Sequence, residues 1–200
     1  MKRAILATRR MAFGFLVAGL VGGIHLADAQ QARPGAEPTG PIAIRRVQFS
    51  AEGTPEYAVK GARQTSGRAK NWLRVTCEYD SSPAWLDEAT FTYYVLLKGA
   101  SRDVPPFTLL RGEVTYINIE QGRRRMSDMF VHPDILSRYG AVERVAVVVR
   151  VGGRVVGMDG RPAVESRWWE QLSPVDGLVM NRMQTPFAFI DVDDFPMIKP

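Results

Sequence analysis

The stretch ATFTYYVLLK at residues 89–98 places the apolar side chains of Phe91, Tyr93, Val95 and Leu97 at every second position. Thr90 and Thr92 lie between them, with Lys98 at the end. Because successive side chains of a β-strand point to opposite faces, this period of two indicates a strand with one buried face.

A second run, ERVAVVVRV at residues 143–151, shows the same alternation, and both of its faces are largely apolar. It is therefore predicted to be a central strand. Gly152 and Gly153 follow it, and two consecutive glycines supply the positive φ angles of a two-residue hairpin turn. The next strand should begin at Arg154.

Working outward from these runs, short apolar or alternating segments recur between clusters of Gly, Pro, Asp and Ser, which is typical of all-β proteins. The spacing favours an immunoglobulin-like or fibronectin-like β-sandwich of about seven strands over a closed barrel. The predicted strands are Ile42–Ser50, Trp72–Tyr79, Ala89–Lys98, Thr108–Glu120, Arg124–Val131, Glu143–Val151 and Arg154–Met158.

One short helix is predicted within residues 132–140, where Pro133 stands in the first turn and Gly140 at the end. The sandwich should occupy residues 42–158. Residues 159–200 are predicted to form a C-terminal extension that packs on it, adding an edge strand at either Leu178–Met183 or Phe187–Val192.

The N-terminus has the pattern of an export signal over residues 1–29: a basic start, an apolar run at Met11–Ile24, and Ala27-Asp28-Ala29 before the expected cut. A retained anchor is the alternative, but the run is short against the roughly 20 residues that span a bilayer. The pair Arg9-Arg10 partly resembles a twin-arginine signal. Residues 30–41 are rich in Pro and Gly and should form a flexible linker.

Cleavage also changes the charge, because it removes four basic residues and Asp28 and lowers the net charge from +5 to +2. A nearly neutral chain attracts phosphate polymers weakly, and neither an RNA-binding aromatic motif nor a zinc-finger spacing is present. We therefore expect an exported protein, periplasmic or associated with the outer membrane, with no nucleic-acid partner and no stable membrane span.

No catalytic signature emerges, and we expect no enzyme, no cofactor and no metal. Cys77 alternates with Leu73 and Val75 and is predicted to be a buried hydrophobe, not a nucleophile. His132 precedes Pro133 and should cap the helix. Asp191, Asp193 and Asp194 resemble a calcium-ligand run but lack the turn glycine and closing glutamate, so they indicate a solvated tail.

The candidates for partner binding are Trp168, Trp169, Arg123, Arg124 and Arg125. Adjacent tryptophans on a strand would point to opposite faces, leaving one exposed for a sugar ring or a protein interface. The alternative is that both are buried under the extension. The three arginines follow Gly122 at a predicted hairpin turn, where they are either solvated or dock a partner or an anionic glycan.

Five motifs stand out: YAVKG (57–61), NWL (71–73), TYYVLL (92–97), LRGEVTY (110–116) and Tyr139-Gly140 before a valine-rich strand. Together they resemble a family of small exported bacterial proteins, pilus-like or pilus-associated, with an immunoglobulin-like sandwich and links to type IV pilus-type gene clusters. The resemblance covers about Ile42–Val156 and offers no catalytic residues. Met11–Ile24 lacks the glutamate of type IV pilins, so the resemblance implies an accessory component and not a pilin.

These observations together predict a non-enzymatic cell-envelope protein, an accessory or scaffold component that contacts envelope or pilus-assembly proteins. Strand addition at an open sheet edge is one physical route to such contacts. A glycan-binding module that uses an exposed tryptophan is the alternative.

Overall fold

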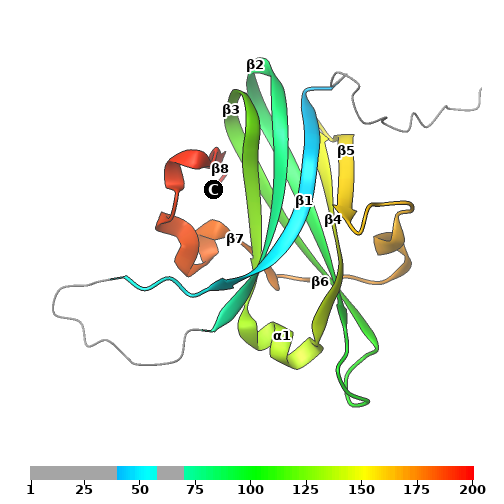
Figure 1. Ribbon diagram of the computed structural model, residues 1–200. Helices are drawn as coiled ribbons and strands as arrows, with labels where there is room; N and C mark the ends of the chain where they lie inside the picture. Colours follow the sequence, from blue (N-terminus) through cyan, green and yellow to red (C-terminus); the bar gives the residue numbers. More distant parts are fainter. Residues whose placement is uncertain (1–39, 58–69) are drawn as a thin grey trace, which may run out of the picture. The chain divides into compact units, whose positions relative to one another are not determined.

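The computed structural model describes residues 40–57 and 70–200, and the export signal and nearly all of the predicted linker lie outside them (Figure 1). Within the described ranges, no helix has the length and apolar character needed to cross a bilayer. Of the motif YAVKG (57–61), which contributes to the family resemblance, the structure describes only Tyr57.

Eight strands form one hydrogen-bonded sheet, in which β5, β4, β2, β3 and β6 lie in that order. β1 pairs with β2, and β7 and β8 both pair with β3. The long strands are β1 (Ile42–Gly53), β2 (Asn71–Lys98), β3 (Phe107–Val131), β4 (Ala141–Val151) and β5 (Arg154–Arg161). The short ones are β6 (Val175–Asp176), β7 (Val179–Asn181) and β8 (Met197–Ile198).

β2 and β3 are long enough to contribute to two layers. The first part of β2 pairs with β1 and with the end of β3, whereas its last part pairs with β4 and with the start of β3. Between the parts, Ser81 is opposite Gly122 and Trp85 is opposite Glu120. β2 therefore advances by four residues where β3 advances by only two. Such extra residues bend a strand pair sharply. We call this bend the arch.

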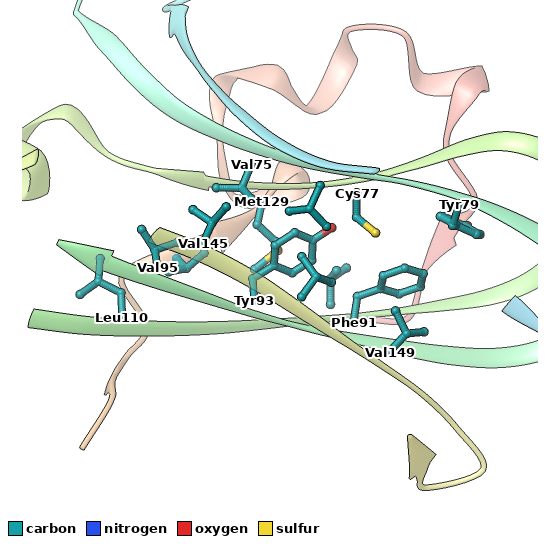
Figure 2. Close-up of a cluster of buried hydrophobic side chains, with 14 of the residues drawn as sticks. Val75, Cys77, Tyr79, Phe91, Tyr93, Val95, Leu110, Met129, Val145 and Val149 are labelled. Carbon is teal, nitrogen blue, oxygen red and sulfur yellow. The ribbon is translucent and has the colours of Figure 1, made fainter. Parts of the chain in front are cut away.

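The two layers enclose one core. Figure 2 shows Val75, Cys77 and Met129 on one side, facing Phe91 and Tyr93 on the other. All five are buried. The sandwich-like all-β fold is therefore confirmed, and the period-two runs supply its interior, as expected for strands with one apolar face.

The prediction of seven separate strands was wrong in one respect. Trp72–Tyr79 and Ala89–Lys98 are two parts of the continuous strand β2. Thr108–Glu120 and Arg124–Val131 are likewise two parts of β3. Turn-forming residues at each junction suggested breaks, but they form the arch, where the strands bend without ending.

Two local predictions are confirmed. Gly152 and Gly153 have φ angles of 56° and 76° and join β4 to β5. The helix α1 spans Pro133–Tyr139, and Gly140 follows it with a φ of 110°. A Cβ at Gly140 would collide with the Lys98 carbonyl, so only glycine allows the chain to pass the end of β2 here.

The C-terminal extension packs on the outer surfaces of both layers. Its 3₁₀ helix η1 (Trp168–Gln171) places Trp169 against Tyr94, with the rings stacked 5.3 Å apart. The helices η2 (Arg182–Gln184), η3 (Pro186–Phe189) and η4 (Val192–Asp194) follow. Phe187 of η3 stacks on Phe130 of β3 at 4.6 Å. Of the two predicted edge strands, the first contains β7, whereas Phe187–Val192 is not a strand.

Cys77 has no exposed surface, and burial raises the pKa of its thiol. It is the one cysteine of the chain. In the native protein a thiol reagent should therefore modify Cys77 at least about a thousandfold more slowly than in urea, because reaction requires the core to open. Mass spectrometry of quenched samples measures both rates. Equal rates would contradict the packing of the core.

Candidate functional site

The outer edge of β3 is covered by the chain itself. β6 pairs with it at Leu110 and Arg111, β8 at Tyr116 and Ile117, and β7 at residues 129–131. Three short strands from the extension thus satisfy backbone groups along an edge that would otherwise be free to pair with another chain.

β1 and β5 are different, because β1 pairs only with β2 and β5 pairs only with β4. Among the described residues, none hydrogen-bonds to the outer edge of either strand. In Figure 1 β1 lies beside β4 and β5. The Ile44 side chain approaches Gly157 of β5, so the two strands touch through side chains without forming a ladder.

A shallow cleft of about 570 Å³ lies between these two strands. β1 lines it with Arg46, Val47 and Phe49, and β5 lines it with Asp159 and Arg161. Apolar groups and charges of both signs are therefore arranged beside an unpaired strand edge. We call β1 and this cleft the β1 seam.

At the arch, one carboxylate organises the backbone. Arg45 donates to Asp80 Oδ2 through Nε at 2.8 Å and also through Nη2, and the backbone N–H of Arg124 donates to Oδ1 at 2.9 Å. The Arg45 hydrogen bond lowers the pKa of the Asp80 carboxyl, and the N–H of Arg124 and the charge of Arg123 act in the same direction, against partial burial.

The predicted arginine triplet divides at this point. Arg123 and Arg124 are exposed, with Arg124 in the left-handed region at a φ of 55°. Arg125 is half-buried, and its Nη2 donates to the Gln121 carbonyl at 3.3 Å and lies 3.4 Å from Glu120 Oε2. Two of the three arginines are thus available to a partner, and partner binding by the triplet stays a prediction.

The tryptophan pair lies on η1 and not on a strand. Trp169 is 5% exposed, whereas Trp168 is half-buried and contacts the Trp169 ring edge-on at 5.5 Å. The indole with a large free surface is Trp85 of the arch, which is 63% exposed. Sequence reasoning missed Trp85 because it lies between the predicted strands Trp72–Tyr79 and Ala89–Lys98; a tryptophan close to the turn-forming residues 81–83 was the available signal.

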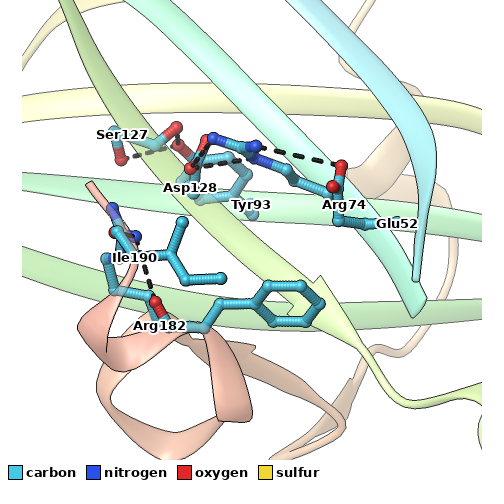
Figure 3. A network of polar contacts seen from close by, with 8 residues as sticks. Glu52, Arg74, Tyr93, Ser127, Asp128, Arg182 and Ile190 are labelled. Atoms are coloured by element: carbon cyan, nitrogen blue, oxygen red, sulfur yellow. Dashed lines mark hydrogen bonds and ion pairs between the residues drawn. The ribbon is translucent and has the colours of Figure 1, made fainter. Parts of the chain in front are cut away.

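Figure 3 shows two sets of polar contacts, one within the sandwich and one within the extension. Arg74 donates to the buried Asp128 at 3.0 and 2.7 Å and lies 3.9 Å from Glu52. Arg182 is buried, donates to the carbonyls of Phe187 and Ile190, and lies over the Phe195 ring at 3.6 Å. The Arg182 contacts hold the segments of the extension together, and the stacking of Phe187 on Phe130 attaches them to the β1 layer.

A second shallow hollow lies on the outer surface of the other layer. There Arg150 donates to the Thr92 hydroxyl at 2.8 Å, and that hydroxyl donates to Glu113 at 3.0 Å. The hydrogen bonds run across three neighbouring strands, so these side chains already satisfy one another.

Cys77 and His132 lie in separate environments. His132 Nδ1 accepts a hydrogen bond from the Asp134 backbone N–H at 3.1 Å, and this confirms the predicted helix cap. Asp191, Asp193 and Asp194 are exposed. Within residues 40–57 and 70–200, no three His, Cys, Asp or Glu side chains are grouped closely enough to hold a metal ion.

Comparison with known proteins gives one family and one fold. A protein-family model matches residues 34–200, which include both the sandwich and the extension. A crystal structure of a protein from Akkermansia muciniphila is similar, with a TM-score of 0.69 and 20% identity over 80% of this chain and 93% of that one. At this identity the likeness concerns the fold alone. None of the curated proteins is significantly similar in sequence.

Asp80→Asn should lower the free energy of unfolding at pH 7 by about 1–2 kcal/mol, because it weakens the hydrogen bonds from Arg45 and Arg124. A lowered native pKa stabilises the fold above the unfolded-state value, about 3.9, and this stabilisation is lost as the pH falls through the native value. The difference between wild type and variant should therefore shrink below about pH 4 in urea titrations.

The control for this comparison is Asp103→Asn, which changes an exposed aspartate in the turn between β2 and β3. Its stability should follow that of the wild type at each pH. A pH-independent loss in Asp80→Asn would mean that the Asp80 charge does not stabilise the arch.

Proposed function

The chain belongs to the family whose model spans residues 34–200, and we propose that it is a non-enzymatic accessory or scaffold component of an exported, type IV pilus-like envelope assembly. It acts through protein–protein contacts. The sequence motifs that resemble pilus-associated proteins support this role, and the missing glutamate in Met11–Ile24 distinguishes it from a pilin.

The observation that carries this proposal is the unpaired edge of β1 beside the cleft. The extension uses three short strands on the β3 edge, whereas no described residue pairs with the outer edge of β1. Unpaired N–H and C=O groups give a partner strand its affinity, and pockets for alternate side chains give it specificity. In the β1 seam, Phe49 provides an apolar contact, with Asp159 and Arg161 on the opposite side.

Export to the periplasm or the outer membrane is part of the same proposal. The basic and apolar N-terminal pattern supports it. The burial of Cys77, the one cysteine of the chain, supports it too. A buried, unreactive Cys77 suits an oxidising compartment, in which an exposed thiol would form unwanted disulfides.

A photo-reactive amino acid at Arg46 should cross-link to a discrete envelope protein in cells of the native host, because Arg46 lines the β1 seam. The matched control replaces Arg144, an exposed arginine within β4, and should give no such product. Blotting against the chain and mass spectrometry of the shifted band identify the partner. Equal products from both positions, or none from Arg46, would contradict strand addition at β1.

Glycan binding is the second candidate, and the exposure of Trp85 is the observation that favours it. A free indole face stacks well on sugar rings. In that case cell-wall or mucin-type sugars should shift tryptophan fluorescence, the shift should disappear in Trp85→Ala, and it should persist in Trp168→Ala. An unchanged spectrum at millimolar sugar would exclude this candidate.

A further inference from the structure

The three C-terminal 3₁₀ helices expose a group of apolar side chains. Phe189 is 81% exposed, Met183 61% and Val192 56%. In the same segment Phe187 points inward and stacks on Phe130, so the segment carries apolar groups on both its inner and outer surfaces. Several exposed apolar groups on one short segment, residues 183–192, indicate a contact surface.

This surface is also acidic. Residues 183–198 contain Asp191, Asp193 and Asp194 and no lysine or arginine. Asp193 and Asp194 lie in the first turn of η4, and neither forms an ion pair within the described part of the chain. We call Met183, Phe189, Val192, Asp193 and Asp194 the acidic cap.

The arch has the complementary chemistry. Trp85 offers an exposed indole, and Arg123 and Arg124 offer exposed guanidinium groups. Neither guanidinium forms an ion pair with a described residue. Tryptophan and arginine are also the residues most enriched among the strong contributors to protein interfaces. We call Trp85, Arg123 and Arg124 the basic arch.

We propose that copies of this chain associate head to tail, with the acidic cap of one copy on the basic arch of the next. Apolar side chains beside carboxylates would meet an indole beside guanidinium groups, so both the apolar area and the charges are matched. An arginine can also lie over an exposed aromatic ring such as Phe189. A second copy is the occupant for which the chain itself supplies complementary chemistry.

The contact joins two different surfaces, so a row of copies always has a free cap at one end and a free arch at the other. Such heterologous contacts form rings or open filaments. No residue of the cap or the arch lines the cleft of the β1 seam. Self-association therefore stands or fails independently of partner binding at β1.

Sedimentation velocity of the mature chain over a wide concentration range tests the proposal. The weight-average mass of the wild type should rise with concentration and fall as salt is added. Asp193→Lys/Asp194→Lys and Arg123→Glu/Arg124→Glu should each weaken association by at least about tenfold, because like charges then meet across the contact. Far-UV circular dichroism checks that each variant is folded.

Mixing the two variants gives the sharpest result. The first keeps an intact arch and the second an intact cap, and the reversed cap of the first is opposite in charge to the reversed arch of the second. An equimolar mixture should therefore regain the concentration-dependent association that each variant alone has lost. Glu56→Lys/Glu165→Lys is the control for the first variant; it makes the same change in net charge at exposed residues elsewhere and should associate like the wild type.

A wild type that stays monomeric at every concentration would overturn the proposal. So would association that both charge-reversed variants retain, or a mixture that stays monomeric. Sugar binding that requires Trp85, without self-association, would assign the arch to a glycan instead.

Discussion

The structure depends on the arch, where β2 has four steps opposite two of β3. A pair of strands this long would otherwise continue as one twisted ribbon with an uncovered apolar face. Because the arch bends both strands together, the face that carries Tyr79 turns toward the face that carries Phe91 and Tyr116. The ring centroids of Tyr79 and Phe91 then lie 5.0 Å apart, and those of Phe91 and Tyr116 lie 5.5 Å apart.

This bend also determines which strand edges remain. Since β2 and β3 are shared by both layers, each layer has one edge formed by β3 and one formed by β1 or β5. The extension covers the β3 side of both layers, and its side chains cover part of both outer surfaces through Trp169 and Phe187. The proposed function follows from this asymmetry, because β1 and β5 are the long strands whose outer edges no described residue pairs with.

Much of the sandwich could be predicted from alternation alone, because a strand with one buried face must repeat every two residues. The same logic placed Cys77 in the core, and local backbone requirements predicted the turn at Gly152 and the helix after His132. What alternation could not show was continuity: Ser81-Ser82-Pro83 has the composition of a turn whether the strand ends or bends. The partners of Arg182 and Trp169 depend on contacts far apart in sequence, which no local pattern reveals.

The candidate surfaces were likewise predictable where local sequence decides them and not where specific contacts do. Exposed arginines after Gly122 were predictable, because turns carry charges. That Arg125 is half-buried depends on its contacts with Gln121 and Glu120, which the sequence pattern did not reveal. The exposure of Trp85 arises from the arch, and the local signal for it was a tryptophan close to turn-forming residues.

Amide hydrogen exchange of the mature chain tests the central claim, an open β1 edge, most directly. An edge strand directs alternate N–H groups to its ladder partner and to solvent. Along β1, fast and slow amides should therefore alternate, whereas β3 should be protected on both sides at residues 129–131, where β2 and β7 flank it. Uniform protection along β1, equal to that of β3, would contradict the account.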